Sequence, residues 1–340
     1  MRGITALLLG SMAIASAESF PNGFVGPEAC APCHAAQYGT QKTSRHALAL
    51  RPIGQSTAFK GQPPITERDY STTYETKPDG VQVRVDAAGK KIDAVLQWAF
   101  GAGAQGITPV GIYGGQYFEH RYSYYSAPQR LAPTFGHPKR AATAEAALGV
   151  LQDGTTISRC FNCHATGVQP SSSGPDLQGM LPGITCERCH GPGAAHVAAA
   201  KAGAAPETVR RSVVNPKRFP ARAQVQMCGE CHRLPPPEGP SPEPEIEDPV
   251  SVRLAPIGLM ASRCFTESKQ LACVTCHDPH ADVKPRTDLS YTEKCLGCHA
   301  ASSVKSKCPR PSDRNCVSCH MPQAALGAYL RFTDHRIRVR

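Results

Sequence analysis

Aromatic side chains are scarce in this chain of 340 residues, at 6% of the total, and tryptophan occurs once. Glycine and proline are frequent by contrast, with 30 and 31 residues. A polypeptide of this composition would bury a poor hydrophobic core on its own. We therefore expect the fold to depend on something besides its own side chains.

Long apolar runs are also lacking. Beyond residues 1–17, no segment is apolar enough to span a bilayer. Residues 1–17 combine a charged start at Arg2, a short apolar run and the small residues Ala15-Ser16-Ala17, which is typical of a cleaved secretory signal peptide. We therefore expect an exported protein, periplasmic or secreted, without a transmembrane segment.

Acidic residues are fewer than basic ones, 27 against 37, which gives a formal net charge of +10. Such an excess would ordinarily suggest nucleic acid, a membrane surface or an acidic partner. The lysine and arginine residues are scattered rather than gathered into one patch. We therefore exclude nucleic acid as a partner.

What the chain does contain is cysteine in one repeated pattern. Fourteen of the sixteen cysteines fall in seven C-x-x-C-H pentapeptides, which are Cys30, Cys33 and His34; Cys160, Cys163 and His164; Cys186, Cys189 and His190; Cys228, Cys231 and His232; Cys273, Cys276 and His277; Cys295, Cys298 and His299; and Cys316, Cys319 and His320. This is the attachment signature of c-type haem, in which both cysteines bond to the porphyrin and the histidine ligates its iron.

Zinc sites and thioredoxin-like redox pairs also use paired cysteines. Zinc does not require a histidine after every second cysteine, and a redox motif would normally occur once, beside a βαβ pattern. The pattern therefore predicts seven covalently attached haem c groups. Their propionates would offset most of the basic excess. Their bulk would supply the missing apolar volume and their thioether bonds would staple the loops, so we expect the haem-free chain to be largely unfolded.

Each motif supplies one axial ligand, so the chemistry depends on what lies across each iron. Six histidines remain for seven irons, namely His46, His120, His137, His196, His280 and His335. At least one iron must therefore take another ligand or stay open. Met180, Met227, Met260 and Met321 could each offer a thioether, but methionine more often packs, and none is assigned.

Two of these histidines follow a motif closely: His280 lies three residues after His277, and His196 lies six after His190. A segment pinned to one face of its own haem can hardly reach the opposite face, so each is expected to ligate a neighbouring haem. His46, His335 and His137 are further candidate ligands, although a helix face or a polar tail could simply carry them. His120, within a strand pattern, is the least favoured, and no catalytic residue is assigned.

The two spare cysteines, Cys264 and Cys308, would form a disulfide in an oxidising compartment, with two independent thiols as the alternative. The spacing of motifs divides the mature chain into a first haem segment (18–63), a cysteine-free insertion (64–131) and a multihaem domain (132–340). In the insertion, Val81, Val83 and Val85 alternate after Asp79-Gly80, a hairpin-turn signal. The insertion would cover haem edges or offer a docking face, or it would only pack.

Helices are expected after the first motif over about 42–50, over 141–151 and over 194–203, and an extended connection over 233–249. The predicted fold class is mainly α, with extensive irregular loops organised around covalently bound haems and a small β-rich insertion at about 64–131.

Several stretches resemble the multihaem c-type cytochromes of the cytochrome c554-like, doubled CxxCH group. They are Phe24–Cys30 with Ser44-Arg45-His46, Cys189–Gly193 followed by His196, Cys276–His280, and Cys319–Pro322 with Asp334-His335-Arg336. The resemblance implies mostly bis-histidine haems, stacked in pairs among short helices and long loops, that serve electron transfer. Related pentahaem nitrite reductases use a lysine-ligated catalytic haem, and the lack of a C-x-x-C-K motif here counts against that enzyme.

We therefore expect an exported heptahaem cytochrome that carries electrons between a membrane quinol-linked donor and a terminal reductase or extracellular acceptor. The alternative is a multihaem oxidoreductase that acts on a small nitrogen or sulfur oxyanion at one open iron. A non-haem zinc or thiol protein is a third hypothesis, which a pyridine haemochrome spectrum would eliminate.

Overall fold

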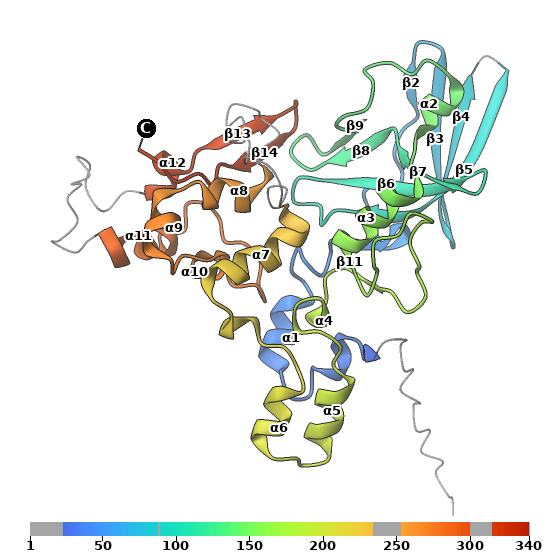
Figure 1. The fold of residues 1–340 in the computed structure, drawn as a ribbon. Coiled ribbons are helices and arrows are strands. Elements are labelled where there is room, and N and C mark those ends of the chain that lie inside the picture. Colours follow the sequence, from blue (N-terminus) through green and yellow to red (C-terminus); the bar gives the residue numbers. More distant parts are fainter. Residues whose placement is uncertain (1–22, 88, 234–252, 300–314, 340) are drawn as a thin grey trace, which may run out of the picture.

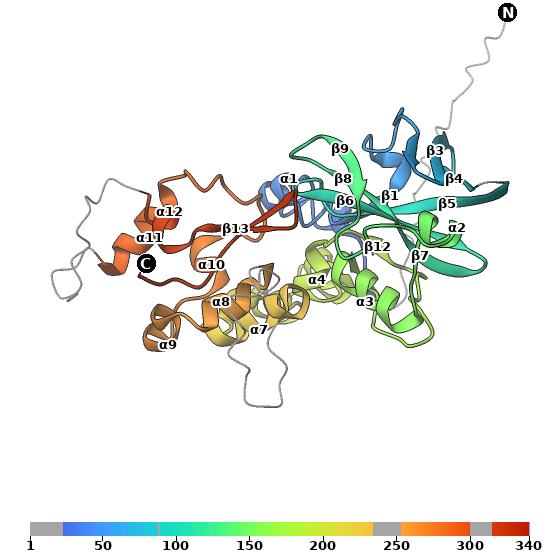
Figure 2. The same cartoon turned by 90° about the horizontal axis from the view of Figure 1, so that it is seen from above.

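The computed structural model describes residues 23–87, 89–233, 253–299 and 315–339 (Figure 1). The predicted signal peptide, residues 234–249 of the predicted connection and Cys308 lie outside these ranges. The described chain has two regions, which Figures 1 and 2 show side by side. We call residues 50–151 the sheet region, and residues 23–49 and 154–339 the motif region. No helix of the described ranges is long and apolar enough to cross a membrane.

One ten-stranded antiparallel sheet dominates the sheet region. Its strands are β1 (Leu50–Pro52), β2 (Ile65–Glu67), β3 (Tyr70–Lys77), β4 (Gly80–Ala87), β5 (Lys90–Phe100), β6 (Gly106–Tyr113), β7 (Gln116–His120), β8 (Tyr122–Tyr125), β9 (Arg130–Pro133) and β10 (Gly149–Leu151). The order is β10-β7-β6-β5-β4-β3-β2, with β1 paired to β5 and with β8 between β6 and β9. Two strands, β1 and β8, therefore branch from the main path.

The predicted alternation forms the core of this sheet. Val81, Val83 and Val85 of β4 are buried, and Val83 pairs with Ala94 of β5. The predicted hairpin is confirmed, because Lys77 pairs with Gly80 across the turn. A Cβ at Gly80 would lie 2.3 Å from the Leu96 carbonyl oxygen, so only glycine fits at this point.

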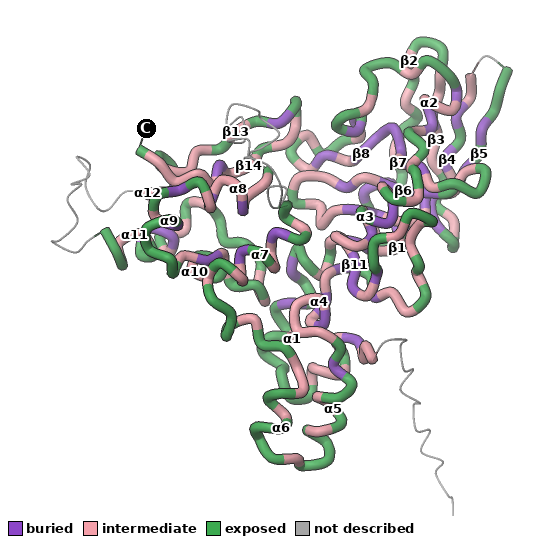
Figure 3. Tube along the Cα trace, in the orientation of Figure 1, coloured by how far each residue is buried: buried purple, intermediate pink, exposed green. Residues whose placement is uncertain are grey.

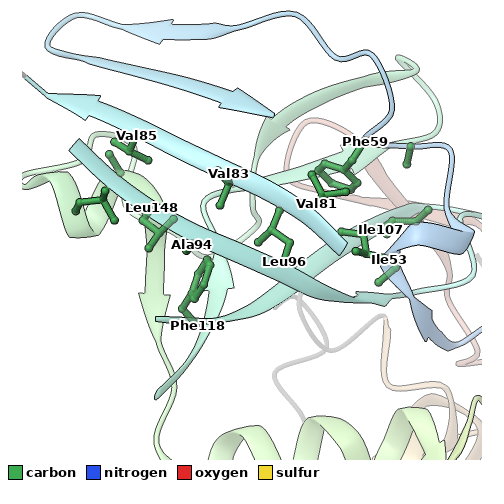
Figure 4. Close-up of a cluster of buried hydrophobic side chains, with 14 of the residues drawn as sticks. Ile53, Phe59, Val81, Val83, Val85, Ala94, Leu96, Ile107, Phe118 and Leu148 are labelled. Carbon is green, nitrogen blue, oxygen red and sulfur yellow. The ribbon is translucent and has the colours of Figure 1, made fainter. Parts of the chain in front are cut away.

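Helix α2 (Ala144–Leu148) covers one face of the sheet, and Thr143 caps its N-terminus by accepting a hydrogen bond from the Ala146 amide. Leu148 packs with the β4 and β5 side chains and with Phe118 in one buried cluster (Figure 4). The sheet region therefore has a continuous core of its own.

The predicted fold class, mainly α with a small β insertion, is wrong. The sheet is the largest single unit of the described chain, and it takes in β1 and β10, which lie outside 64–131. These three-residue strands have too little pattern to be recognised, and they form because distant strands accept them: β1 pairs with β5, and β10 pairs with β7. The prediction rested on the seven C-x-x-C-H motifs, which favour short helices and loops around bound haems.

The motif region consists of short helices: α1 (Ala35–Gln41), α3 (Gly154–His164), α4 (Cys186–His190), α5 (Ala194–Lys201), α6 (Pro206–Arg211), α7 (Ala221–His232), α8 (Ala255–Met260), α9 (Arg263–Ser268), α10 (Cys273–Cys276), α11 (Ser290–His299) and α12 (Cys316–His320). Two small antiparallel pairs accompany them, β11 (Ala165–Thr166) with β12 (Leu181–Pro182) and β13 (Gln323–Leu326) with β14 (Leu330–Thr333). Buried segments are sparser here than in the sheet region (Figure 3).

The helix predictions had mixed outcomes. The helix expected over 194–203 is confirmed as α5. The helix expected over 42–50 is wrong, because α1 ends at Gln41 and turns follow it. The helix expected over 141–151 stops at Leu148, since a Cβ at Gly149 would lie 2.1 Å from the Glu119 carbonyl oxygen and the backbone there joins β7 as β10.

Candidate functional site: paired histidines between the motifs

Most C-x-x-C-H motifs lie at the C-terminal ends of helices. Helices α3, α4, α7, α11 and α12 each end at the motif histidine, and α10 ends one residue before His277. Residues three and four apart share one face of a helix. The two thiols and the imidazole of such a motif therefore project to the same side, as a haem bonded at its edge and ligated at its iron requires.

Four motif histidines each face a histidine from elsewhere in the chain. The pairs and their ring-centroid distances are His34 with His196 (6.3 Å), His46 with His232 (6.2 Å), His190 with His280 (6.1 Å) and His277 with His335 (6.3 Å). Every pair joins one motif histidine to one non-motif histidine at nearly the same spacing.

This spacing fits an iron between the rings. Two imidazoles on opposite faces of one metal ion have centroids roughly 6 Å apart, because each nitrogen-to-metal bond is about 2 Å long. Unrelated ring contacts would not select a motif histidine and a non-motif histidine each time. The donor set therefore suits bis-histidine haem iron, with the thiols of the same motif beside it.

Hydrogen bonds orient several of these rings. Nδ1–H of His190 donates to the Val214 carbonyl at 2.8 Å, and Nδ1–H of His196 donates to the Val209 carbonyl at 2.9 Å. His335 donates in the same way to Thr333. A carbonyl only accepts, so Nδ1 carries the proton and Nε2 keeps the lone pair that a metal needs.

Burial keeps other rings neutral. It lowers the pKa of His164, His232, His277 and His335, because the charged imidazolium is poorly solvated inside the protein. A neutral imidazole is the form that binds iron, so burial and ligation favour the same protonation state.

The facing partners of His280 and His196 belong to other motifs than the ones these residues follow. His280, just after His277, faces His190, while His196, just after His190, faces His34. Neither histidine faces the histidine of the motif that it follows. The partner of each could not be read from the sequence, because the pairs span long separations.

Three motif histidines, His164, His299 and His320, face no histidine ring among the described residues. Nδ1–H of His164 donates to the Ala49 carbonyl at 2.9 Å, and its ring meets the Phe100 ring edgewise. Nδ1–H of His320 donates to the Arg338 carbonyl at 2.9 Å. Both keep Nε2 for iron, and the structure places no imidazole across from it.

The other two histidines lie in the sheet region. His137, a predicted ligand, has a nearly buried side chain whose Nε2 lies 3.0 Å from a carboxylate oxygen of Glu119. His120 is fully buried, with Nδ1 2.6 Å from the Leu148 carbonyl and Nε2 2.9 Å from the Tyr74 hydroxyl. Burial lowers the pKa of His120 to about 3. Both ring nitrogens of His120 have protein partners, which leaves none for iron.

Neighbouring motifs touch through their cysteines. The thiols of Cys30 and Cys186, of Cys163 and Cys231, and of Cys228 and Cys273 lie close enough to shift each other's pKa. These contacts connect the first motif to the third, the second to the fourth, and the fourth to the fifth. The spare Cys264 is a free, half-buried thiol; its predicted partner Cys308 lies outside the described chain.

One functional residue was missed from the sequence. Glu187, inside the third motif, is 3% exposed, and its carboxylate accepts hydrogen bonds from the amides of Val25, Gly26 and Gly193 at 2.8–2.9 Å. It thereby joins the segment before the first motif to the loop that carries His196. The only signal was an acidic residue at a variable position of the motif.

Seven attachment motifs and four facing imidazole pairs are the pattern expected of a multihaem c-type cytochrome. A family model described as cytochrome c554 and c-prime matches residues 120–191, which contain the second and third motifs. Among curated proteins, the chain is 22% identical over 387 aligned positions to the dissimilatory sulfite reductase MccA of Wolinella succinogenes. That alignment covers 90% of this chain and 52% of the relative, so the chain spans about half the length of the relative.

Two solved structures are similar. The outer cell wall cytochrome OcwA has a TM-score of 0.55 at 16% identity, covering 93% of this chain and 80% of that one. An undecahaem cytochrome from the S-layer of Carboxydothermus ferrireducens has a TM-score of 0.49 at 15% identity, covering 94% and 52%. The likeness to OcwA shows a shared fold. The match to the cytochrome c554 and c-prime model confirms the resemblance to multihaem cytochromes and supports haem c as the cofactor.

Proposed function

We propose that this protein is an exported heptahaem cytochrome that carries electrons between a membrane-linked donor and a terminal reductase or extracellular acceptor. The observation that carries the proposal is the set of four histidine pairs with matched spacing. Iron with both axial positions filled by the protein exchanges electrons but has no position for a substrate. The cysteine residues of all seven motifs would hold the haems, and their histidines would be the proximal ligands.

The contacts between motifs support conduction. His280 belongs to the segment after the fifth motif but faces the histidine of the third, so one short peptide would tie two haems together. Cys228 also lies close to Cys273, which brings the fourth and fifth motifs together in the same way. Such links hold successive redox groups close together and in fixed register, which is what rapid transfer of electrons along the chain needs.

A single substitution tests the pairing. His280→Met replaces the imidazole that faces His190 by a thioether, which raises the reduction potential of a haem. We expect a potentiometric titration to show one haem raised by on the order of 100 mV, within the ~0.8 V that axial ligands span. His137→Met is the matched control, because His137 contacts Glu119. Equal titrations for the two variants would disprove the pairing.

A second candidate function is the reduction or oxidation of a small nitrogen or sulfur oxyanion at one iron with an open position. It is favoured by His164, which is ordered by Ala49 and has no facing imidazole in the described residues. The relation to a protein named a dissimilatory sulfite reductase points the same way, although that protein is twice as long.

Electron paramagnetic resonance separates the two functions. The oxidoreductase requires a high-spin ferric signal that shifts when sulfite or nitrite is added, together with turnover when a reduced viologen dye is the donor. The carrier requires low-spin signals that do not respond to either anion. A pyridine haemochrome assay on the same sample gives the number of haems, for which we expect seven per chain.

A further inference from the structure

A cavity of about 430 Å³ lies in the sheet region, away from the facing histidines. Its lining comes from two parts of the chain, which are Arg51, residues 55–58 and Gln62 in the first, and Ile107 of β6, Tyr124 of β8 and Gln129 in the second. Figure 4 shows Ile107 close to Ile53 at this end of the buried cluster. The volume is within the range of pockets that hold small organic molecules.

The cavity contains one charged side chain, Arg51. Its Nη1 donates hydrogen bonds to the carbonyl oxygens of Leu48 at 2.8 Å and Gly101 at 3.1 Å, which fixes the guanidinium in place. Burial lowers the pKa of Arg51, because the half-buried cation has lost part of its solvation. No acidic side chain lines the cavity, and no carboxylate of the described chain forms an ion pair with Arg51.

The rest of the lining is polar and neutral. Ser56, Thr57 and Tyr124 contribute hydroxyl groups. Nε2 of Gln62 donates a hydrogen bond to the Ala58 carbonyl at 2.8 Å, which leaves its amide oxygen as an acceptor. Ile107 is buried and gives an apolar patch. A half-buried cation that has no acidic partner in the described chain and lies beside three hydroxyl side chains favours an anionic ligand with a polar body and disfavours cations and wholly apolar molecules.

We propose that this cavity binds a small polar organic anion, with its phosphate, sulfonate or carboxylate group on the Arg51 guanidinium and its body against the hydroxyl groups of Ser56, Thr57 and Tyr124. Nε and Nη2 of Arg51 have no hydrogen-bond partner among the described residues, and both can donate to two oxygens of such a group. The cavity volume exceeds what a bare inorganic oxyanion fills, so the ligand has a body of several atoms.

The site is connected to the motif region through Gly101. The Gly101 carbonyl accepts from Arg51, and the Gly101 amide donates to the Ala49 carbonyl at 2.8 Å. That same Ala49 carbonyl accepts the hydrogen bond from His164. A ligand on Arg51 would therefore act, through these hydrogen bonds, on the Ala49 carbonyl that orients His164 of the second motif.

Isothermal titration of the haem-loaded protein tests the site. The probes are glycerol 3-phosphate, isethionate and glycerate, one for each anionic group, with glycerol as the neutral comparison. We expect saturable binding of at least one anion and none of glycerol. Arg51→Gln should weaken that binding at least about tenfold, while Lys60→Gln, an exposed residue of the same segment with the same charge change, should alter it less than about threefold.

Two outcomes would overturn the proposal: dissociation constants weaker than about 10 mM for all three anions, or equal losses of affinity in the Arg51 and Lys60 variants.

Because Arg51 also donates hydrogen bonds to two backbone carbonyls, the Arg51→Gln variant could be less stable than the wild type. Thr57→Phe is the second test, since it fills the cavity from the exposed side and leaves the Arg51 hydrogen bonds intact. It should abolish binding with an unchanged thermal midpoint, and wild-type affinity in this variant would contradict the site.

Discussion

The sheet region and the motif region are stabilised in different ways. In the sheet region, β4, β5, β7 and α2 bury a continuous cluster that reaches from Ile53 to Leu148. In the motif region, the cluster around α7, α8 and α9 contains Val225, Leu259, Phe265 and Ala272 as its buried members. The comparison teaches that one part of the chain carries its own core, whereas the other buries only a small cluster, which we propose the haems complete.

The two regions meet at α3. The C-terminal end of this helix is the second motif, which contains Phe161. Ile157 and Phe161 pack against the sheet, where the Phe161 ring meets those of Trp98 and Phe100 edgewise. The sheet therefore supports one haem site directly, through packing on α3 and through the Ala49 carbonyl that accepts from His164.

The largest expected effect is that of preventing haem attachment. In a chain produced without haem, we expect limited proteolysis to leave a resistant fragment close to residues 50–151 and to degrade the motif region, because only the first has a self-sufficient core. Mass spectrometry of the fragments measures this. Equal protection of both regions, or a fully folded haem-free chain by circular dichroism, would contradict the comparison.

How far the sequence alone could go differs between the same two regions. The alternation of Val81, Val83 and Val85 predicts a strand because its period-two pattern is local. Strands β1 and β10 could not be predicted, since each has three residues and exists through pairing with a distant strand. The fold class was therefore misjudged where the structure depends on long-range pairing.

The candidate site divides in the same manner. The cysteines and proximal histidines are readable because each motif is five consecutive residues. His280 is only three residues from His277, so the sequence indicates that it does not reach the opposite face of the haem of its own motif. Only the folded chain shows that it lies opposite His190. The position of His137 beside Glu119 had no local signal either, because that contact joins a loop to β7.

The ion pair between the buried Arg121 and Glu67 allows the sheet region alone to be destabilised. Arg121 is 1% exposed, and its guanidinium donates to both carboxylate oxygens of Glu67. Glu67→Gln would leave this cation uncompensated, at a cost of about 3 kcal/mol in the free energy of unfolding. Urea unfolding followed by circular dichroism measures it. Asp93→Asn, at an exposed pair with Arg84, is the matched control and should stay near wild type.

The corresponding change in the motif region is Glu187→Gln. The buried carboxylate accepts from three backbone amides, and these charge-assisted hydrogen bonds weaken in the neutral amide. We expect the free energy of unfolding to fall by about 2 kcal/mol. Because Glu187 positions the loop that carries His196, the electron paramagnetic resonance signal of one haem should change as well. Glu207→Gln, on the exposed face of α6, should change neither. A stability loss without a spectroscopic change would limit Glu187 to a packing role.

The smallest expected effect near neutral pH is the pH dependence that His120 gives to the stability of the sheet region. Burial lowers the pKa of His120 to about 3 in the folded state, whereas an unfolded histidine titrates near about 6.5. The unfolded state therefore binds one more proton between these values, and stability falls as pH falls, by about 1.4 kcal/mol per pH unit below about pH 6. Above pH 7 this contribution is fully present.

The slope is measured by urea unfolding at several pH values, with hydrogen exchange of the sheet-region amides as the readout. His120→Asn should be less stable near neutral pH, because it cannot bridge Tyr74 and the Leu148 carbonyl in the same way, but its stability should depend less on pH. An unchanged slope in that variant would assign the acid sensitivity to the motif region, whose histidines would then be released from iron before the sheet unfolds.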